Sequence, residues 1–351
     1  MDSVTQIALG SSVAIATLGR RTAVWKAALW GGIAGTLPDL DALVDHGNPI
    51  LNMVLHRAES HSLFVLTALS LPLAWAVTRL HGQRALQGRW WLALWLALVT
   101  HPLLDWMTVY GTQLLRPFDP TPYAVGSIFI IDPLYTLPLL VAVVAALCWR
   151  SARGVAWVRT ALVLSSAYLL WSVAAQHLVR DRVLASAPVP GLASDQLLVT
   201  PAPFNTLLWR AVAVTPTHYY EGYYALLDGD RPVRWTTHDR GGALYARLQS
   251  NASVAHIARF SHGFFKMSEQ DGTVFITDLR MGNEPAYSFH FGLGTLAQVE
   301  AGAEVVTQQW QRPDATAMLP WMGQRMLGRD VPLPTLRTSI PGPRPPVPGP
   351  P

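Results

Sequence analysis

The stretch Trp90-Trp91-Leu92-Ala93-Leu94-Trp95-Leu96-Ala97-Leu98-Val99-Thr100-His101-Pro102-Leu103-Leu104-Asp105-Trp106 is an apolar run that ends in an imidazole and a carboxylate. Its length is near the roughly 20 residues that an α-helix needs to cross a bilayer. His101 and Asp105 stand four residues apart, so a helix places both side chains on one face, where they can share an ion. The alternative is a buried hydrogen-bonded pair that serves packing. Ionisable groups at membrane depth are costly, which favours a functional role.

Other apolar runs of similar length cover residues 62–78, 128–149 and 155–175, and two shorter runs cover 4–18 and 27–37. The chain is 50% hydrophobic and only 14% charged, whereas soluble domains carry about 25% charged residues. We therefore predict an α-helical integral membrane bundle with about four long transmembrane helices and a short N-terminal helical hairpin.

The pattern changes after the last apolar run. Residues 219–228 and 273–279 alternate polar and apolar side chains and end at turn residues, as strands do. We predict a membrane-embedded metal-site domain over 1–178, followed by a small α+β soluble domain with an antiparallel sheet over 179–331. The proline-rich tail 332–351 is expected to be disordered or extended.

Basic residues gather in three connections, at 20–26, 79–89 and 150–159. By the positive-inside rule these connections face the cytoplasm, so the opposite helix ends, which carry the acids and histidines, face outward. The same reasoning predicts a multi-pass protein of the bacterial inner membrane with an extracytoplasmic C-terminal domain. Topology also explains the net charge of +4. Without a concentrated basic surface, no nucleic-acid partner is expected.

Two aspartates lie in a segment that follows the second short run. Asp39 and Asp41 flank Leu40, and both can aim at one cation in a loop or extended segment. Pro38 stiffens the preceding turn and helps to fix the direction of Asp39. The alternative is an acidic pair that merely caps a helix end.

His56-Arg57-Ala58-Glu59-Ser60-His61-Ser62 is the densest polar cluster of the first half. His56 and His61 are five residues apart and straddle a helix start, so one could bind metal and the other could shuttle protons. Arg57 could neutralise an anionic group such as a phosphate. Ser60 could cap the helix that follows. Either histidine could instead be a surface residue at the level of the lipid headgroups.

Asp132 precedes Pro133 near the outer end of a long apolar run. It could bind metal, orient a ligand histidine, or cap the helix that Pro133 begins. Asp2 and Gln6 would lie on the same side, which makes Asp2 an additional candidate ligand.

At these residues the chain resembles the YdjM/YfhP-type family of inner-membrane proteins, whose members are considered to be metal-dependent hydrolases and, for some, LexA-binding proteins. The resemblance rests on the following stretches: Met1-Asp2-Ser3-Val4-Thr5-Gln6, Gly35-Thr36-Leu37-Pro38-Asp39-Leu40-Asp41, His56-Arg57, Ser60-His61-Ser62 and Thr100-His101-Pro102-Leu103-Leu104-Asp105. Many relatives have histidine where this chain has Gln6, which leaves position 6 without an assigned metal role. The resemblance implies a reaction class and no particular substrate.

We predict a metal-dependent hydrolase that uses a water activated by a divalent ion at the outer membrane face. Zinc is the expected ion and manganese the second choice. Its predicted ligands are Asp39, Asp41, His56, His61, His101 and Asp105, with His61 and Arg57 as catalytic residues. Membrane lipids are the expected surroundings, and the substrate is expected to be a lipid-like molecule or a phosphoester. The alternative is a non-catalytic membrane protein with a structural metal site and a partner-binding outer domain.

Overall fold

The computed structural model describes residues 1–149, 151–303, 305–311 and 314–334. By contacts the chain divides into two compact units. The first comprises Met1–Gly47, Leu51–Ser186 and Val199–Arg210, and the second contains Asn48–Ile50, Ala187–Leu198 and the chain from Ala211 onward. The predicted tail 332–351 lies outside the described residues from 335 on.

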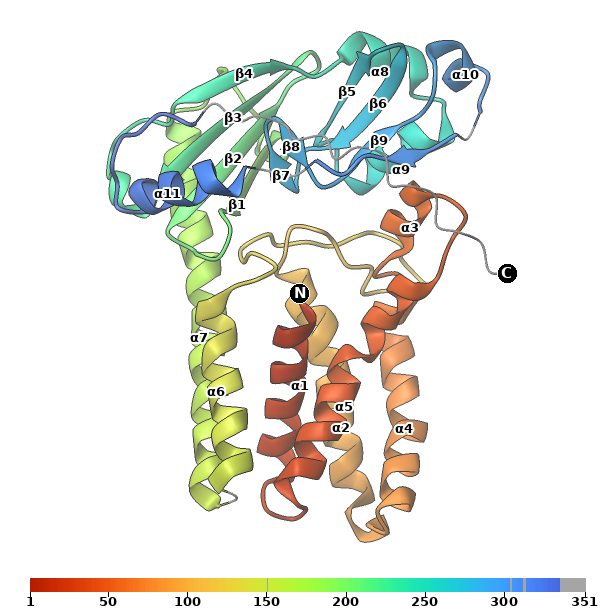
Figure 1. Ribbon diagram of the computed structural model, residues 1–351, viewed down its shortest axis with the longest axis vertical. Helices are drawn as coiled ribbons and strands as arrows, with labels where there is room; N and C mark the ends of the chain where they lie inside the picture. The colour runs from red at the N-terminus through yellow and green to blue at the C-terminus, as the bar shows by residue number, and fades with distance from the viewer. Residues whose placement is uncertain (150, 304, 312–313, 335–351) are drawn as a thin grey trace. The chain divides into compact units, whose positions relative to one another are not determined.

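The first unit is helical, and its helices stand side by side in Figure 1. Its elements are α1 (Ser3–Leu18), α2 (Val24–Thr36), the 3₁₀ helix η1 (Leu37–Leu43), α3 (Pro49–Leu55), η2 (Glu59–His61), α4 (Leu63–Leu80), η3 (Arg84–Leu86), α5 (Gln87–Trp106), α6 (Pro133–Trp149) and α7 (Ala152–Ala185). Helix α1 packs against α2, α5, α6 and α7 and therefore lies at the centre of the bundle.

Glycines let α1 and α2 approach closely. A Cβ atom added to Gly10 would lie 2.2 Å from the Gly31 carbonyl oxygen, and one added to Gly35 would lie 2.5 Å from the Gln6 carbonyl oxygen. Backbone contact at this range requires residues without a side chain, as in many membrane helix pairs. The predicted N-terminal hairpin is thus a tightly packed pair of helices whose end leads directly into η1.

Among the described residues, two helices are long and apolar enough to cross a membrane, Leu63–Leu80 and Ala152–Ala185. Helices Ser3–Leu18 and Pro133–Trp149 are apolar but shorter. The predicted bundle of four long spans is therefore not confirmed, although all six apolar runs form helices. The helix in the run 128–149 is shorter than predicted because Asp132 caps α6 at Pro133. The helix in the run 155–175 is longer than predicted because α7 continues to Ala185.

The chain after α7 is rich in strands. Strands β1 (Leu197–Pro201), β2 (Leu208–Val214), β3 (His218–Ala225) and β4 (Trp235–Asp239) form one sheet in the order β1-β2-β3-β4. Strands β5 (Phe265–Gln270), β6 (Thr273–Asp278), β9 (His290–Gly292) and β10 (Thr307–Gln308) form a second sheet in the order β10-β9-β6-β5, and β7 (Gly282–Asn283) pairs with β8 (Ala286–Tyr287). Helices α8 (Gly242–Leu248), α9 (Ala252–Phe260), α10 (Leu296–Glu300) and α11 (Ala315–Met326) accompany them, with 3₁₀ turns η4 (Ser194–Gln196) and η5 (Leu226–Asp228).

The strand pairing is antiparallel where its register is defined. Tyr219 pairs with His238 between β3 and β4, and Met267 pairs with Ile276 between β5 and β6. The two strands predicted from alternation correspond to β3 and β6, so the prediction of a β-containing C-terminal part is confirmed.

Candidate metal centre

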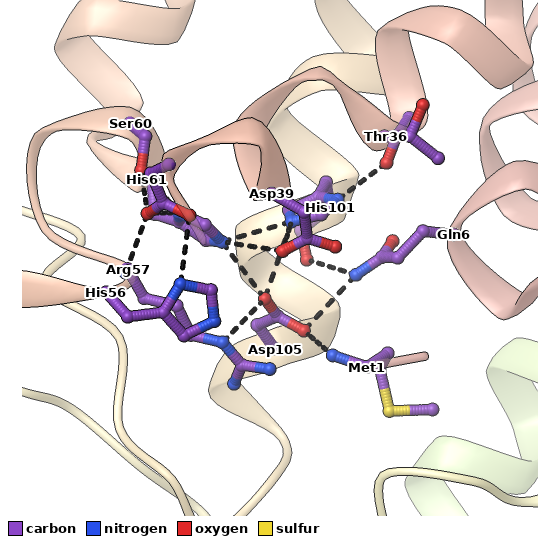
Figure 2. A network of polar contacts seen from close by, with 12 residues as sticks. Met1, Gln6, Thr36, Asp39, His56, Arg57, Ser60, His61, His101 and Asp105 are labelled. Carbon is purple, nitrogen blue, oxygen red and sulfur yellow. Dashed lines mark hydrogen bonds and ion pairs between the residues drawn. The ribbon is translucent and has the colours of Figure 1, made fainter. Parts of the chain in front are cut away.

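Four side chains of the first unit converge on one point, as Figure 2 shows: Asp39, His61, His101 and Asp105. The two Nε2 atoms of His61 and His101 are 3.1 Å apart. Asp105 Oδ2 lies 3.2 Å from His61 Nε2 and 3.4 Å from His101 Nε2, and Asp39 Oδ1 lies 3.5 Å and 3.4 Å from the same atoms. A tetrahedral ion with metal–ligand distances near 2.0–2.1 Å separates its donors by roughly 3.3 Å. The spacing fits such an ion.

Each ligand comes from an element that fixes its direction. His101 and Asp105 lie one turn apart on α5, which continues through Pro102 and packs against α1, α2 and α4. Asp39 lies in η1, which begins where α2 ends. His61 ends η2, just before Ser62 caps α4 by accepting a hydrogen bond from Val65 N. Ser62, not Ser60, is therefore the helix cap.

Hydrogen bonds on the far side of both imidazoles set their orientation. His101 Nδ1 lies 2.6 Å from the Gly35 carbonyl oxygen, which can only accept, so Nδ1 carries the proton and Nε2 presents its lone pair to the cluster. His61 Nδ1 lies 2.8 Å from Ser60 Oγ, whose hydroxyl donates to Asp41 Oδ2 at 2.5 Å. That chain likewise leaves His61 Nε2 with a lone pair. Ligand histidines are oriented in this way in metalloproteins.

The buried atoms of the centre are incompletely satisfied by the protein. The side chains of His61, His101 and Asp105 are fully buried. Among the described residues, Asp105 Oδ2, Arg57 Nε and Gln6 Oε1 are buried side-chain atoms without a hydrogen-bond partner. Two imidazole lone pairs facing each other beside two carboxylates repel one another unless a cation lies between them. The residues present therefore fit a divalent ion.

Asp41 and His56 lie one layer outside the four ligands. Asp41 Oδ1 contacts His56 Nδ1 at 2.9 Å, and Asp41 Oδ2 accepts a hydrogen bond from Arg57 N at 2.9 Å. Asp41 Oδ2 lies 3.6 Å from His61 Nδ1, on the side of the ring away from the cluster. The structure thus places Asp41 where it orients His61 and His56, and it does not include either Asp41 or His56 in the four-residue group.

Both aspartates of η1 are held in the ionised form that metal ligands and their hydrogen-bond partners require. Burial alone would raise the pKa of the Asp39 carboxyl, but the contacts with His101 and His61 outweigh burial and hold this pKa well below its usual range. Burial likewise opposes the shift at Asp41, where contacts with His56 and Ser60 lower the pKa to about 2.

Arg57, which the sequence predicts to be a catalytic residue, lies beside the cluster. Its backbone is in the left-handed region, at φ 64°. Its Nε is 3.2 Å from Asp105 Oδ2, its NH1 donates to Thr108 Oγ1 at 3.2 Å, and its guanidinium lies over the Tyr110 ring. A strained backbone conformation of this kind persists where surrounding contacts hold it in place. Arg57 therefore brings a positive charge to the edge of the centre.

The remaining polar candidates divide into one neighbour of the site and two helix caps. Gln6 Nε2 donates to Asp105 Oδ1 at 3.2 Å, and the Met1 amino group also contacts this oxygen. Asp2 caps α1 by accepting from Thr5 N. Asp132 caps α6 by accepting from Leu134 N, and its other oxygen accepts from the Tyr168 hydroxyl at 2.9 Å. Of the three roles considered for Asp132, the structure shows the cap.

Sequence reasoning missed two parts of the site. The Gly35 carbonyl and the Ser60 hydroxyl orient the two histidines, yet a backbone carbonyl leaves no side-chain signal and Ser60 was assigned to a helix cap. The position of Ser60 directly before His61 is the signal that could have indicated its role.

Comparison with known proteins agrees with the motifs. The model of the YdjM inner membrane protein family matches residues 1–179. A curated relative, the uncharacterized protein YfhP of Bacillus subtilis (strain 168), is 26% identical over 249 residues, which cover 65% of this chain and 71% of that protein. No solved structure matches the chain. Since the family match contains the whole candidate metal centre and covers more than half of the chain's 351 residues, this protein belongs to the YdjM inner membrane protein family.

Proposed function

We propose that this protein is a membrane-bound, metal-dependent hydrolase whose centre is formed by Asp39, His61, His101 and Asp105. The observation that supports it most is the convergence of four donor atoms on one point, two of them imidazole nitrogens and two of them carboxylate oxygens. When bound there, a divalent ion would lower the pKa of a water towards neutrality and stabilise negative charge on the reacting group. Zinc is the expected ion and manganese the alternative.

The protein groups around the centre supply the other requirements of hydrolysis. Arg57 would bind the anionic part of the substrate, since a guanidinium matches phosphate oxygens well. His56 is oriented by Asp41, and its side chain is 25% exposed. It would therefore carry protons between the centre and the solvent. We propose a phosphoester or lipid-like substrate, reached from the extracytoplasmic side of the inner membrane.

A specific observation favours a second candidate, a structural metal site. Structural zinc sites are closed by four protein ligands, whereas catalytic sites have three and leave a position for water. The centre offers four donors, three of them fully buried. The partial exposure of Asp39 and the presence of Arg57 and His56 at the same edge favour catalysis.

The two candidates differ in what ligand variants do. Detergent-purified protein, loaded with zinc or manganese, would be assayed with p-nitrophenyl phosphate and bis-p-nitrophenyl phosphate. Catalysis predicts that Asp39→Asn abolishes hydrolysis while the protein keeps its thermal unfolding midpoint within a few degrees. A structural site predicts that the same variant unfolds early and that the wild-type protein hydrolyses neither ester. Asp45→Asn, a change at an exposed aspartate outside the cluster, is the matched control.

A further inference from the structure

The edge of the metal centre that solvent can reach is formed by η1. The side chains of Asp39 and Asp41 are 22% and 13% exposed, whereas His61, His101 and Asp105 are fully buried. A substrate can therefore approach the centre across η1, beside the partly exposed His56.

The same short element and the residue that follows it expose large apolar side chains. Leu40, between the two aspartates, is 55% exposed, and Leu43 and Val44 are 83% and 53% exposed. Apolar side chains that are exposed together often mark a site that binds a ligand, a membrane or another protein. Here Leu40, Leu43 and Val44 lie on the segment of chain that also carries Asp39 and Asp41.

The apolar surface continues onto a helix that can cross a membrane. Phe64, in the first turn of α4, stacks edge-to-face with Phe118 at 5.1 Å between ring centroids, and both are more than half exposed. Further along α4, Leu69 and Leu71 are exposed as well. Element η2, which carries His61, packs against both η1 and α4. The exposed residues Leu40, Leu43, Val44, Phe64 and Phe118, here called the apolar rim, therefore lie on η1, on α4 and on segments that follow or contact them.

We propose that the substrate is a lipid-borne phosphoester, whose acyl chain lies on the apolar rim while its anionic headgroup enters the centre beside Arg57. This inference rests on the proposed hydrolase function and adds the substrate class and the residues that recognise it. Charge supports the orientation, because the guanidinium of Arg57 lies next to the centre, whereas the five side chains of the rim are themselves uncharged. A soluble phosphoester would gain nothing from the rim.

The first test measures binding without turnover. Metal-free and metal-loaded protein in nanodiscs would be photolysed with a phosphatidic acid that carries a diazirine on its acyl chain, and the labelled peptides identified by mass spectrometry. We expect labelling within residues 37–47 that unlabelled dioleoyl phosphatidic acid competes away and dioleoyl phosphatidylcholine does not. Labelling that is absent from this segment, or competed equally by both lipids, would overturn the inference.

The second test separates this inference from the hydrolase function. Hydrolysis of dihexanoyl and dioleoyl phosphatidic acid and of p-nitrophenyl phosphate would be compared in mixed micelles. We expect a long-chain preference that falls about tenfold in the double variant Leu43→Ser, Val44→Ser, because each buried apolar group contributes to substrate discrimination. The matched control is Val163→Ser, Leu164→Ser, an exposed apolar pair of α7.

The outcomes are distinguishable. Equal turnover of both chain lengths, with no effect of the rim variant, would overturn lipid recognition and leave the hydrolase intact. Absence of turnover of all three compounds would remove the hydrolase and this inference with it, whatever the labelling shows.

Discussion

Asp39 and Asp41 differ by what their carboxylates touch, although the sequence treats them as a pair. Asp39 Oδ1 faces two imidazole Nε2 atoms, whereas Asp41 binds His56, Ser60 and the backbone of Arg57. In a 3₁₀ helix, the side chains of residues two positions apart, such as Asp39 and Asp41, point in directions that differ by about 120°. Asp39 therefore faces the candidate metal site, and Asp41 contacts the groups that orient His61 and His56.

Because of this difference, we expect substitutions of Asp39 and of Asp41 to affect metal binding differently. Asp39→Asn should remove stoichiometric metal, because it deletes a charged ligand. Asp41→Asn should keep one binding site but weaken it by roughly 10–100-fold, as loss of a group that orients a ligand does. Chelator competition on the purified protein measures both. Equal affinity losses in the two variants would contradict the distinction.

For single residues, the sequence indicated which side chains could bind a metal, but it did not indicate which of them lie in the four-residue cluster and which lie outside it. The spacing of His101 and Asp105 predicted a shared helix face, and the structure brings both to the centre. The metal role of each predicted ligand stays a prediction. What spacing could not give was the inner or outer position of Asp41 and His56, because this depends on the path of η1 in three dimensions.

Helix packing determines whether the centre can form at all. Gly35 contacts the α1 backbone and supplies the carbonyl that orients His101. We expect Gly35→Ala to lower the thermal unfolding midpoint and the metal content together, because its Cβ would separate α1 from α2. Gly88→Ala is the control, since a Cβ at Gly88 meets nothing within 4 Å. Metal content equal to wild type in Gly35→Ala would show that the interface tolerates separation.

In the second unit, one buried ion pair joins η5 to α11. Arg325 NH1 and NH2 donate to Asp228 Oδ1 and Oδ2 at 3.0 and 2.6 Å, and both side chains are nearly inaccessible. Removing one partner of a buried pair leaves an uncompensated charge and costs about 3 kcal/mol. We expect this loss of unfolding free energy in Asp228→Asn, and about 0–1 kcal/mol in Asp330→Asn, whose pair with Arg234 is exposed.

The Asp228 pair also predicts a pH dependence. Burial alone would raise the pKa of the Asp228 carboxyl, but Arg325 and the Ala225 N–H hold this pKa below its ordinary value. A depressed carboxyl pKa stabilises the fold above the unfolded-state value of about 3.9, and this contribution is lost as pH falls through the folded-state value. Thermal unfolding of wild type and Asp228→Asn should therefore differ at pH 7 and converge as the pH is lowered below about 4. A constant difference across this range would exclude the linkage.

For the whole molecule, apolar runs predicted where helices lie better than which of them cross the membrane. All six runs became helices, but only α4 and α7 are long and apolar enough among the described residues. Helix α5 carries Gln87, Arg89, His101 and Asp105, and α6 begins late because Asp132 caps it. The alternation of polar and apolar residues was enough to predict strands in the C-terminal part. The order of the strands in each sheet could not be predicted in this way, because it depends on contacts between residues far apart in sequence.

The predicted sidedness remains to be measured. In a background where Cys148 is replaced by serine, a cysteine at Ser186 should react with a membrane-impermeant maleimide added to intact spheroplasts. A cysteine at Arg84, in the α4–α5 connection, should react only after permeabilisation. The reverse pattern would place the metal centre and the chain after α7 on the cytoplasmic side.

We expect the four side chains from η1, η2 and α5 to hold one divalent ion. Elemental analysis by inductively coupled plasma mass spectrometry, on protein purified after loading with zinc or manganese, tests it most directly. We expect one equivalent of metal per chain in wild type and in His46→Ala, and none in His61→Ala or His101→Ala. Metal-free wild-type protein, or metal retained in both ligand variants, would contradict it.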